Sequence, residues 1–315
     1  MSNNNYTELS DSDDCEKYIS QFIQDFPLRS AEIGQGTVIK RALPSRHKRM
    51  IGAWCFLDHA GPAVFPQGDG LDVGPHPHIG LQTFTWMIEG SMMHTDSLGS
   101  RQLIRPGQVN LMTAGYGIAH AEVAPETETH LHAAQLWIAL PDDKINMAPR
   151  FDHYPELPVV SQDGVDFTVL VGEFLSVKSP VAVHTELLGV DLQAQESTRT
   201  RIGLNPKFEY GFLALEGTAS INGHELTEDN MVVLEPGLER VDIEIHAHSR
   251  VLLLGGEPFE SPILLWWNFV GRTQEELNLA RDQWINHDER FGNIPDYEGP
   301  RLEAPAFPDK MRASK

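Results

Sequence analysis

The sequence predicts an all-β protein that consists of two antiparallel β-barrels and a short C-terminal helix. Its 315 residues are about twice the size of a typical domain, so two compact units are expected, although one long barrel would also account for the length. Short runs of β-forming residues alternate with turn residues, and the 26 Gly and 21 Pro suit such a fold better than a helical bundle. A repeated phrase further suggests that one barrel is a duplicate of the other.

The first 28 residues are expected to form an acidic extension outside both barrels. They hold one weak helix candidate, Cys15 to Ile23, along which Tyr18, Phe22 and Ile23 could share a face. The first barrel is assigned to residues 29–160. Its expected strands are Thr37 to Ala42, Gly52 to Leu57, Gln82 to Ile88, Val109 to Thr113 and Ala133 to Ala139.

The second barrel, with the helix, is assigned to residues 161–315. Its expected strands are Phe167 to Val171, Val181 to Leu188, Phe212 to Leu215, Met231 to Leu234, Val241 to Ile245 and Val251 to Leu254. The repeated phrase links the two barrels at a spacing of about 130 residues. In the first barrel Ile88-Glu89-Gly90 is followed by Arg105-Pro106-Gly107. In the second barrel Leu215-Glu216-Gly217 is followed by Glu235-Pro236-Gly237.

One helix is expected near the C-terminus. Thr273 and Glu276 form a capping-box signature, and the helix should run toward Gly292. Its apolar residues recur at helical spacing, and we expect them to pack against a barrel rather than to bind a partner: Leu277, Ala280, Trp284 and Ile285.

Composition excludes several classes of function. The formal charge of −21 and the lack of a Lys/Arg-rich block argue against direct nucleic-acid binding. Two cysteines, Cys15 and Cys55, support neither a disulfide framework nor a cysteine metal site. No secretion signal and no run of 18 apolar residues is present, so a cytoplasmic protein without a membrane span is expected.

The candidate chemistry lies in two short motifs. In His76-Pro77-His78 the two imidazoles, at positions i and i+2 of an extended strand, point to the same face and can bracket one ion. His120-Ala121-Glu122 repeats this geometry with a carboxylate. Neighbouring strands would bring all four donors together as a site of three histidines and one carboxylate.

Such a donor set suits Fe(II), Mn(II), Ni(II), Cu(II) or Zn(II), whereas Ca and Mg prefer oxygen ligands. Four protein ligands leave two positions of an octahedral ion open, which suits O₂ or a chelating substrate better than a structural role.

Other histidines are weaker candidates. The pair His246 and His248 is expected in a solvated edge or turn, whereas His130 or His132 could lie beside the metal ligands. Three more are expected in loops or at hairpin tips: His59, His94 and His224. Motifs for Rossmann hydride transfer, P-loop phosphoryl transfer and serine hydrolysis are absent from the sequence.

Several short sequence segments resemble those of the pirin family of the cupin superfamily. The resemblance extends from about Glu32 to about Gly292. The segments are His76-Pro77-His78-Ile79-Gly80, Glu89-Gly90-Ser91-Met92, Met112 to Glu122, Gln135-Leu136-Trp137 and Gly255-Gly256-Glu257-Pro258. The stretch from Met112 to Glu122 is the most specific of these.

The resemblance implies a bicupin, with two stacked jelly-roll barrels of the double-stranded β-helix type. It implies one metal, iron above all, in the first barrel at the positions matching His76, His78, His120 and Glu122, and no metal in the second. Some pirins are associated with opening the flavonol ring of quercetin with O₂. Others are described as regulators that bind transcription factors or metabolic enzymes.

The expected function is therefore a pirin-like Fe(II) dioxygenase that acts on a flavonol such as quercetin, with Glu122 accepting the substrate proton. Two alternatives stay open: a redox-sensitive iron protein that binds a transcription factor or metabolic enzyme, and a barrel that holds the metal only for stability. Gln82 departs from the cupin pattern, which has Glu there. This costs no ligand if Glu122 supplies the carboxylate, but it could alter hydrogen bonding around the metal.

Overall fold

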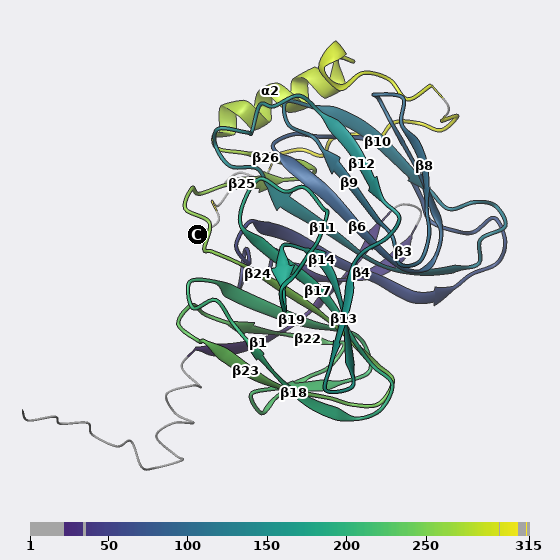
Figure 1. Cartoon of the computed structure of the whole chain (residues 1–315). Coiled ribbons are helices and arrows are strands. Elements are labelled where there is room, and N and C mark those ends of the chain that lie inside the picture. The colour runs from purple at the N-terminus through teal and green to yellow at the C-terminus, as the bar shows by residue number, and fades with distance from the viewer. Residues whose placement is uncertain (1–21, 34–35, 296, 308–312, 314–315) are drawn as a thin grey trace, which may run out of the picture.

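The computed structural model describes residues 22–33, 36–295, 297–307 and 313, and it has two similar halves, one above the other in Figure 1. Each half contains one seven-stranded and one four-stranded sheet, and all their strand pairs are antiparallel. The two sheets of a half share no strand pairing within the described residues, so each barrel is an open, two-sheet one.

The first half contains the strands that bear the expected metal ligands. Its seven-stranded sheet has, in spatial order, β12 (Arg150–Tyr154), β9 (Val109–Thr113), β6 (Leu81–Gly90), β11 (His130–Ala139), β4 (Trp54–Val64), β3 (Thr37–Leu43) and β2 (Arg29–Ile33). Its four-stranded sheet has β5 (Asp72–His78), β10 (Ile118–Val123), β7 (Met92–Asp96) and β8 (Arg101–Ile104).

The second half repeats this arrangement. Its seven-stranded sheet has β1 (Ile23–Pro27), β22 (Asn230–Leu234), β19 (Glu209–Glu216), β24 (Ser249–Gly256), β17 (Leu187–Ala194), β14 (Val165–Val171) and β13 (Val159–Gln162). Its four-stranded sheet has β18 (Thr198–Gly203), β23 (Arg240–Ile245), β20 (Ala219–Ile221) and β21 (His224–Leu226). A small hairpin, β15 (Glu173–Phe174) and β16 (Val177–Lys178), lies in the β14–β17 connection.

The shared strand order is the structural sign of duplication, and it corrects one part of the sequence repeat. Ile88-Glu89-Gly90 ends β6 and Leu215-Glu216-Gly217 ends β19, which are equivalent strands. The Pro-Gly turns are not equivalent, because Pro106-Gly107 precedes β9 whereas Pro236-Gly237 follows β22, the counterpart of β9.

Strand β1 corrects the prediction for the N-terminal extension. The helix candidate Cys15 to Ile23 lies outside the described residues except for its last two, and there Phe22 is in a turn and Ile23 begins β1. β1 pairs with β22 at the edge of the second half's large sheet, the place that β12 takes in the first half. Residues 23–27 therefore belong to the second half, not to an appendage.

The two large sheets pack face to face, and this contact forms one core that both halves share. It includes Trp54, Phe84 and Leu136 from the first half and Leu213 and Leu252 from the second. The Trp54 indole also donates a hydrogen bond to the carbonyl of Leu188 across the contact, at 3.1 Å. Two-residue alternation sends neighbouring side chains to the opposite face, into the interior of each half.

The C-terminal residues close one end of the first half. Helix α2 (Gln274–Ile285) begins with the predicted capping box of Thr273 and Glu276, and a turn of 3₁₀ helix, η1 (Glu289–Phe291), follows it. Leu277, Ala280 and Trp284 are buried as expected, but the Ile285 side chain is exposed. Helix α2 lies beside the hairpin of β25 (Leu264–Trp266) and β26 (Phe269–Gly271) in Figure 1, and both pack against Ile79, the residue that follows β5.

One expected strand is misplaced. Val181 to Leu188 was predicted as a strand, but β17 begins only at Leu187, and residues 181–186 form a connection. Val181 is nevertheless buried in the shared core, so its apolar character reflects packing of a loop rather than a strand. The other expected strands coincide with observed ones to within three residues at either end, except that β4 continues to Val64, beyond the expected end at Leu57.

The interior of the second half is filled with apolar side chains where the first half has its candidate ligands. The inward positions of β18, β20 and β23 are all buried: Thr200, Ile202, Ile221, Val241, Ile243 and Ile245. None of these side chains is a usual metal ligand, and the expected absence of a metal from the second half stays a prediction.

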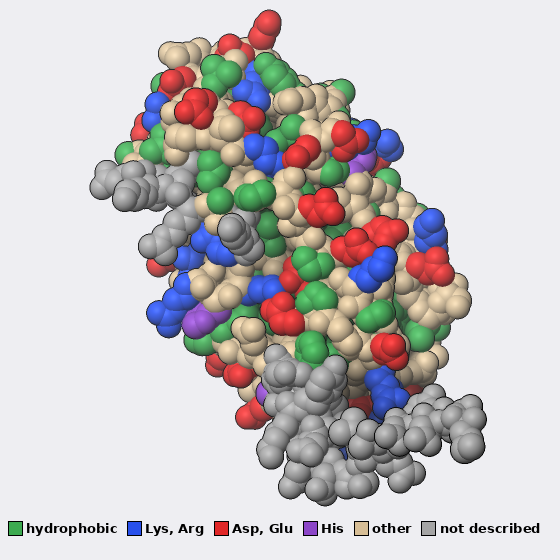
Figure 2. Space-filling view, turned by 90° about the vertical axis from the view of Figure 1, so that its left-hand side faces the viewer, with side chains coloured by type: hydrophobic (Ala, Val, Ile, Leu, Met, Phe, Trp, Pro, Cys, Tyr) green, Lys and Arg blue, Asp and Glu red, His purple; other side chains and the backbone are tan. Residues whose placement is uncertain are grey.

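Acidic and basic side chains both occur on the face drawn in Figure 2, and several basic ones gather at the middle of its left-hand side, beside a histidine. Among the described residues, no helix is long and apolar enough to cross a membrane.

Candidate metal centre

Strands β5 and β10 bring the two sequence motifs together. They pair antiparallel with His120 opposite His76 and Ile118 opposite His78. A bulge follows, so that Glu122 lies opposite Val73. The side chains of His76, His78, His120 and Glu122 all point into the space between the two sheets of the first half, and all four are buried.

The three imidazoles converge through their Nε2 atoms. The Nε2 atoms of His78 and His120 lie 3.0 Å apart, and the ring centroids of His76 and His120 are 4.3 Å apart. Nδ1 of His76 donates to the carbonyl of Gly74 at 2.8 Å, and Nδ1 of His78 donates to that of Asn268 at 2.9 Å. A carbonyl can only accept, so both imidazoles carry their proton on Nδ1 and keep the Nε2 lone pair free for a metal.

Glu122 lies close to His120, which is also a member of the imidazole cluster. The donor atoms of His76, His78 and His120 lie within 4.8 Å of one another, and those of His94, His120 and Glu122 form a second such group. The four predicted ligands are thus neighbours, but they are not one group at this distance. His120 belongs to both groups and joins the carboxyl to the other two imidazoles.

His94 is a component of the site that the sequence interpretation missed. It was expected in a loop or hairpin tip, but it lies in β7 and is buried, with Asp96 two residues further along the same strand face. The alternation of Met92, His94 and Asp96 was the available signal, because period two indicates an inward strand face.

Burial sets the charges of the site. It lowers the pKa of His76 to about 4 and, helped by the neighbouring imidazoles, lowers the pKa of His78 and His120 well below 6.5. It also raises the pKa of the Glu122 carboxyl to about 7, and no hydrogen bond or ion pair to it is seen within the described residues. Neutral imidazoles beside an unpaired carboxyl fit a divalent transition-metal ion, which would supply the missing positive charge.

A cavity of about 450 Å³ opens onto the imidazoles. Its wall includes Phe56 and Trp137, whose rings stack at 4.0 Å between centroids. Arg41 lies over the ring of Phe56 and forms a two-pronged ion pair with Asp58, with both N–O distances 2.6 Å. Segments distant in sequence complete the wall, with Trp267 and Asn268 from the β25–β26 turn and Leu302 from the C-terminal segment.

His130 and His132 do not lie beside the metal ligands, contrary to one alternative from the sequence. The Nε2 atoms of His132 and His59 are 2.8 Å apart, and Nδ1 of His132 lies 3.2 Å from Glu216 of the second half. His59 is therefore a buried residue of β4 rather than a loop residue. His130 contacts the hydroxyl of Thr129.

Three other histidines lie where the sequence predicted them. His246 and His248 are exposed at a turn, and His224 follows the Asn222-Gly223 turn between β20 and β21.

Gln82 faces away from the metal centre. Its amide nitrogen donates to Thr113 at 2.9 Å and to the carbonyl of Ala182, in the second half, at 3.4 Å. On β6 it shares a face with Phe84, which belongs to the core between the halves. Gln82 therefore gives no hydrogen bond to a metal ligand, contrary to the effect considered from the sequence.

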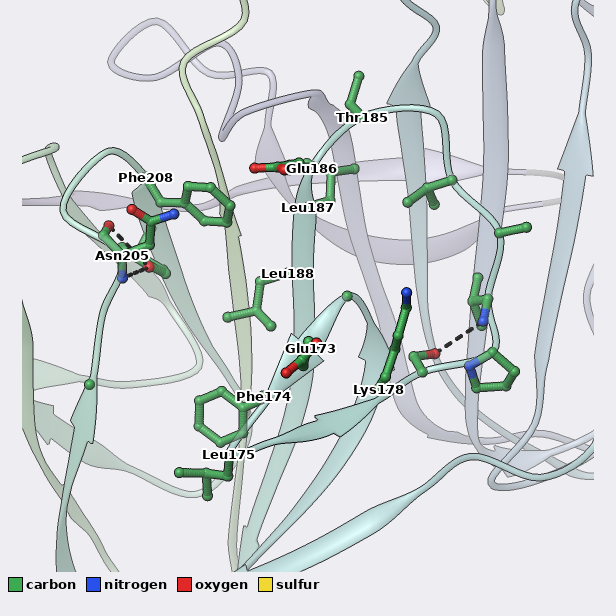
Figure 3. A pocket seen from close by; sticks show the side chains of 18 residues that line it. Glu173, Phe174, Leu175, Lys178, Thr185, Glu186, Leu187, Leu188, Asn205 and Phe208 are labelled. Atoms are coloured by element: carbon green, nitrogen blue, oxygen red, sulfur yellow. Dashed lines mark hydrogen bonds between the residues drawn. The ribbon is translucent and has the colours of Figure 1, made fainter.

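The second half has a cavity of its own, of about 840 Å³, at one end of its large sheet (Figure 3). Lys178, Glu173 and Phe208 are among its lining side chains, and it has no histidine or cysteine in its wall. Its wall therefore offers carboxylates but no imidazole or thiolate to a metal ion.

The strand order, together with the histidine centre found among the described residues, defines a bicupin with a candidate metal site. The Pirin family model matches residues 36–138, and the model of the Pirin C-terminal cupin domain matches residues 189–292. The chain belongs to the pirin family.

Individual relatives support the same family assignment. A Pseudomonas aeruginosa protein, named provisionally as a quercetin 2,3-dioxygenase, is 50% identical over 97% of both chains. The crystal structure of a quercetin 2,3-dioxygenase from Acinetobacter baumannii is 74% identical, covers 95% of this chain and 100% of its own, and superimposes with a TM-score of 0.94. A bacterial pirin from Escherichia coli, solved in complex with nickel(II), shares the fold at 21% identity and a TM-score of 0.59, covering 75% of this chain and 99% of its own.

Proposed function

We propose that this pirin is a dioxygenase that uses Fe(II) to add O₂ to a flavonol such as quercetin and opens the ring with release of carbon monoxide. The observation that carries the proposal is the cluster of three neutral imidazoles, with the Glu122 carboxyl beside His120, in the wall of a cavity of about 450 Å³, a size typical of small-molecule sites. The 74% identity with the Acinetobacter quercetin 2,3-dioxygenase supports the reaction class.

His76, His78, His120 and Glu122 would hold the metal, which would supply the redox chemistry that O₂ requires. The donor set of three nitrogens and one oxygen favours Fe(II) and its transition-metal neighbours over Ca and Mg.

Glu122 is the residue that we assign to proton transfer. In the metal-free protein burial raises its pKa to about 7, whereas a bound cation would lower that pKa and leave the carboxylate able to accept a proton when it loosens from the metal. If it takes the proton of a flavonol hydroxyl, Glu122→Gln should raise the pH needed for substrate binding under anaerobic conditions. An unchanged pH dependence would remove this role.

The cavity wall suits a flat, hydroxylated ligand. Phe56 and Trp137 offer aromatic surface, and Arg41, Asp58 and Gln135 offer polar groups at one side.

Oxygen uptake tests the proposal. Protein purified anaerobically and reconstituted with Fe(II) should consume O₂ when quercetin is added, in proportion to its iron content, and His76→Ala and His120→Ala should abolish the uptake. No uptake at full iron occupancy would refute the dioxygenase while leaving the metal centre in place.

A second candidate is a binding protein whose affinity for a protein partner depends on the metal. The hydrogen bond from His78 to Asn268 favours it, because it links a metal ligand to the turn between β25 and β26. A pull-down that compares ferrous, ferric and metal-free protein should then recover a partner from one state only. Equal recovery in all three states would exclude this function. The cytoplasmic location stays a prediction.

A further inference from the structure

We propose that His94 and Asp96 are positioning residues of the metal centre, which fix the tautomer and ring orientation of His120 so that its Nε2 atom faces the metal. The inference rests on the proposed metal centre and does not depend on the identity of the substrate.

The geometry is a chain of three side chains on two neighbouring strands. In the pairing of β7 with β10, Asp96 lies opposite His120 and His94 lies opposite Glu122. Nδ1 of His120 lies 3.4 Å from Nδ1 of His94, and Nε2 of His94 lies 3.1 Å from Oδ2 of Asp96. All three side chains are at most 2% exposed, and the His94 ring stacks on Phe151 at 4.3 Å.

Asp96 sets the direction of the hydrogen bonds in this chain. Its Oδ1 atom accepts the backbone N–H groups of Leu98 at 2.9 Å and Ser100 at 3.0 Å, which fixes the carboxylate and turns Oδ2 toward His94. A carboxylate only accepts, so the His94 proton lies on Nε2 and its Nδ1 becomes an acceptor. Nδ1 of His120 must then donate, which leaves the Nε2 lone pair of His120 for the metal.

His120 differs from the other two imidazoles in how its tautomer is set. His76 and His78 donate to backbone carbonyls, of Gly74 and Asn268, which no substitution removes. His120 depends on side chains, so its orientation can be changed without altering any ligand.

Asp96→Asn should reverse the direction of the hydrogen bonds that run from His120 through His94 to residue 96. The two backbone N–H groups would retain the amide oxygen, so the amide nitrogen would face His94 and force its proton onto Nδ1. That proton would lie against the proton on Nδ1 of His120. The His120 proton would then have to move to Nε2, the atom that binds the metal. Loss of such an outer contact costs about 10-fold to 100-fold in metal affinity.

Substitutions of His94 separate hydrogen bonding from packing. His94→Phe retains an aromatic ring against Phe151 but offers no acceptor, so it should weaken metal binding as Asp96→Asn does. His94→Gln offers an amide oxygen to His120 and an amide N–H to Asp96, so it should restore most of the affinity. Thr95→Val, on the opposite face of the same strand, is the matched control and should leave affinity unchanged.

Two measurements without turnover decide the proposal. Dissociation constants for Co(II) come from competition with a chelator, and pulsed electron paramagnetic resonance of the Cu(II)-loaded protein detects the remote nitrogens of bound imidazoles. We expect weaker Co(II) binding and an altered remote-nitrogen signal in Asp96→Asn and His94→Phe, with both restored in His94→Gln.

Equal dissociation constants and equal spectra in folded Asp96→Asn and wild type would overturn the proposal. If Asp96→Asn does not fold, equal affinities of His94→Phe and His94→Gln would overturn it instead. Wild-type protein that binds no Co(II) would refute the metal centre itself, which is a different result from loss of quercetin turnover alone.

Discussion

The Glu122 carboxyl is buried beside imidazoles that are themselves uncharged at neutral pH, and this imbalance of charge is the main electrostatic feature of the site. In the unfolded chain its pKa is near 4.5, whereas in the folded protein it is about 7. The folded protein therefore binds this proton more tightly than the unfolded chain does. The protonated Glu122 carboxyl therefore contributes stability that is fully present below pH 4.5 and is lost as the pH rises through 7.

This shift predicts how Glu122→Gln changes the metal-free protein. The carboxylate lowers stability by about 3 kcal/mol above pH 7, so Glu122→Gln should raise the free energy of unfolding at pH 8 by up to this amount. At pH 4 the gain should vanish. Chemical denaturation at the two pH values, with a chelator present, measures it, and the same gain at both would disprove the assignment.

At the scale of single residues, the sequence supplied three of the imidazoles and the carboxyl but not His94. The two motifs were visible because each pairs its donors at i and i+2 within a strand. His94 shares that spacing only with Asp96, and it was expected in a loop or at a hairpin tip. Its place beside His120 depends on the pairing of β7 with β10, which local sequence does not encode.

At the scale of elements, β1 shows how a segment near the N-terminus stabilises the distant half. Phe26 of β1 is buried in the core between the halves and stacks on His47. Its partner strand, β22, lies about 200 residues away in sequence, so the periodicity near Phe26 could not reveal the pairing. The same limit applies to β17, where an apolar run that packs as a loop resembled a strand.

Phe26→Ala should therefore destabilise the protein by about 3–5 kcal/mol, because it removes a large buried ring and leaves a cavity. Gln24→Ala, at an exposed position of the same strand, should change stability by less than about 0.5 kcal/mol. Urea denaturation of both variants gives the comparison. A loss below about 1 kcal/mol for Phe26→Ala would indicate that β1 is not part of the stable sheet.

At the scale of the whole molecule, one core joins the two halves. Side chains of both large sheets interdigitate there, and Lys48 of the first half forms ion pairs with Glu209 and Glu235 of the second, at 2.6 and 2.9 Å. The duplicated architecture was predictable from length and turn spacing. The face-to-face contact of the sheets was not, because both faces of their strands are apolar and the sequence does not distinguish them.

This shared core predicts that the halves unfold together. Metal-free protein should show one calorimetric transition, with coincident changes in circular dichroism and tryptophan fluorescence. Two separated transitions would mean that the contact between the halves contributes little to either.

The central claim is that His76, His78, His120 and Glu122 bind one metal in the first half, and anomalous diffraction from crystals of the Fe(II)-reconstituted protein tests it most directly. One iron peak is expected, at about 2.1 Å from the Nε2 atoms of the three imidazoles and from a carboxylate oxygen of Glu122. A peak at another place in the chain, or none at this site in fully reconstituted protein, would contradict the claim.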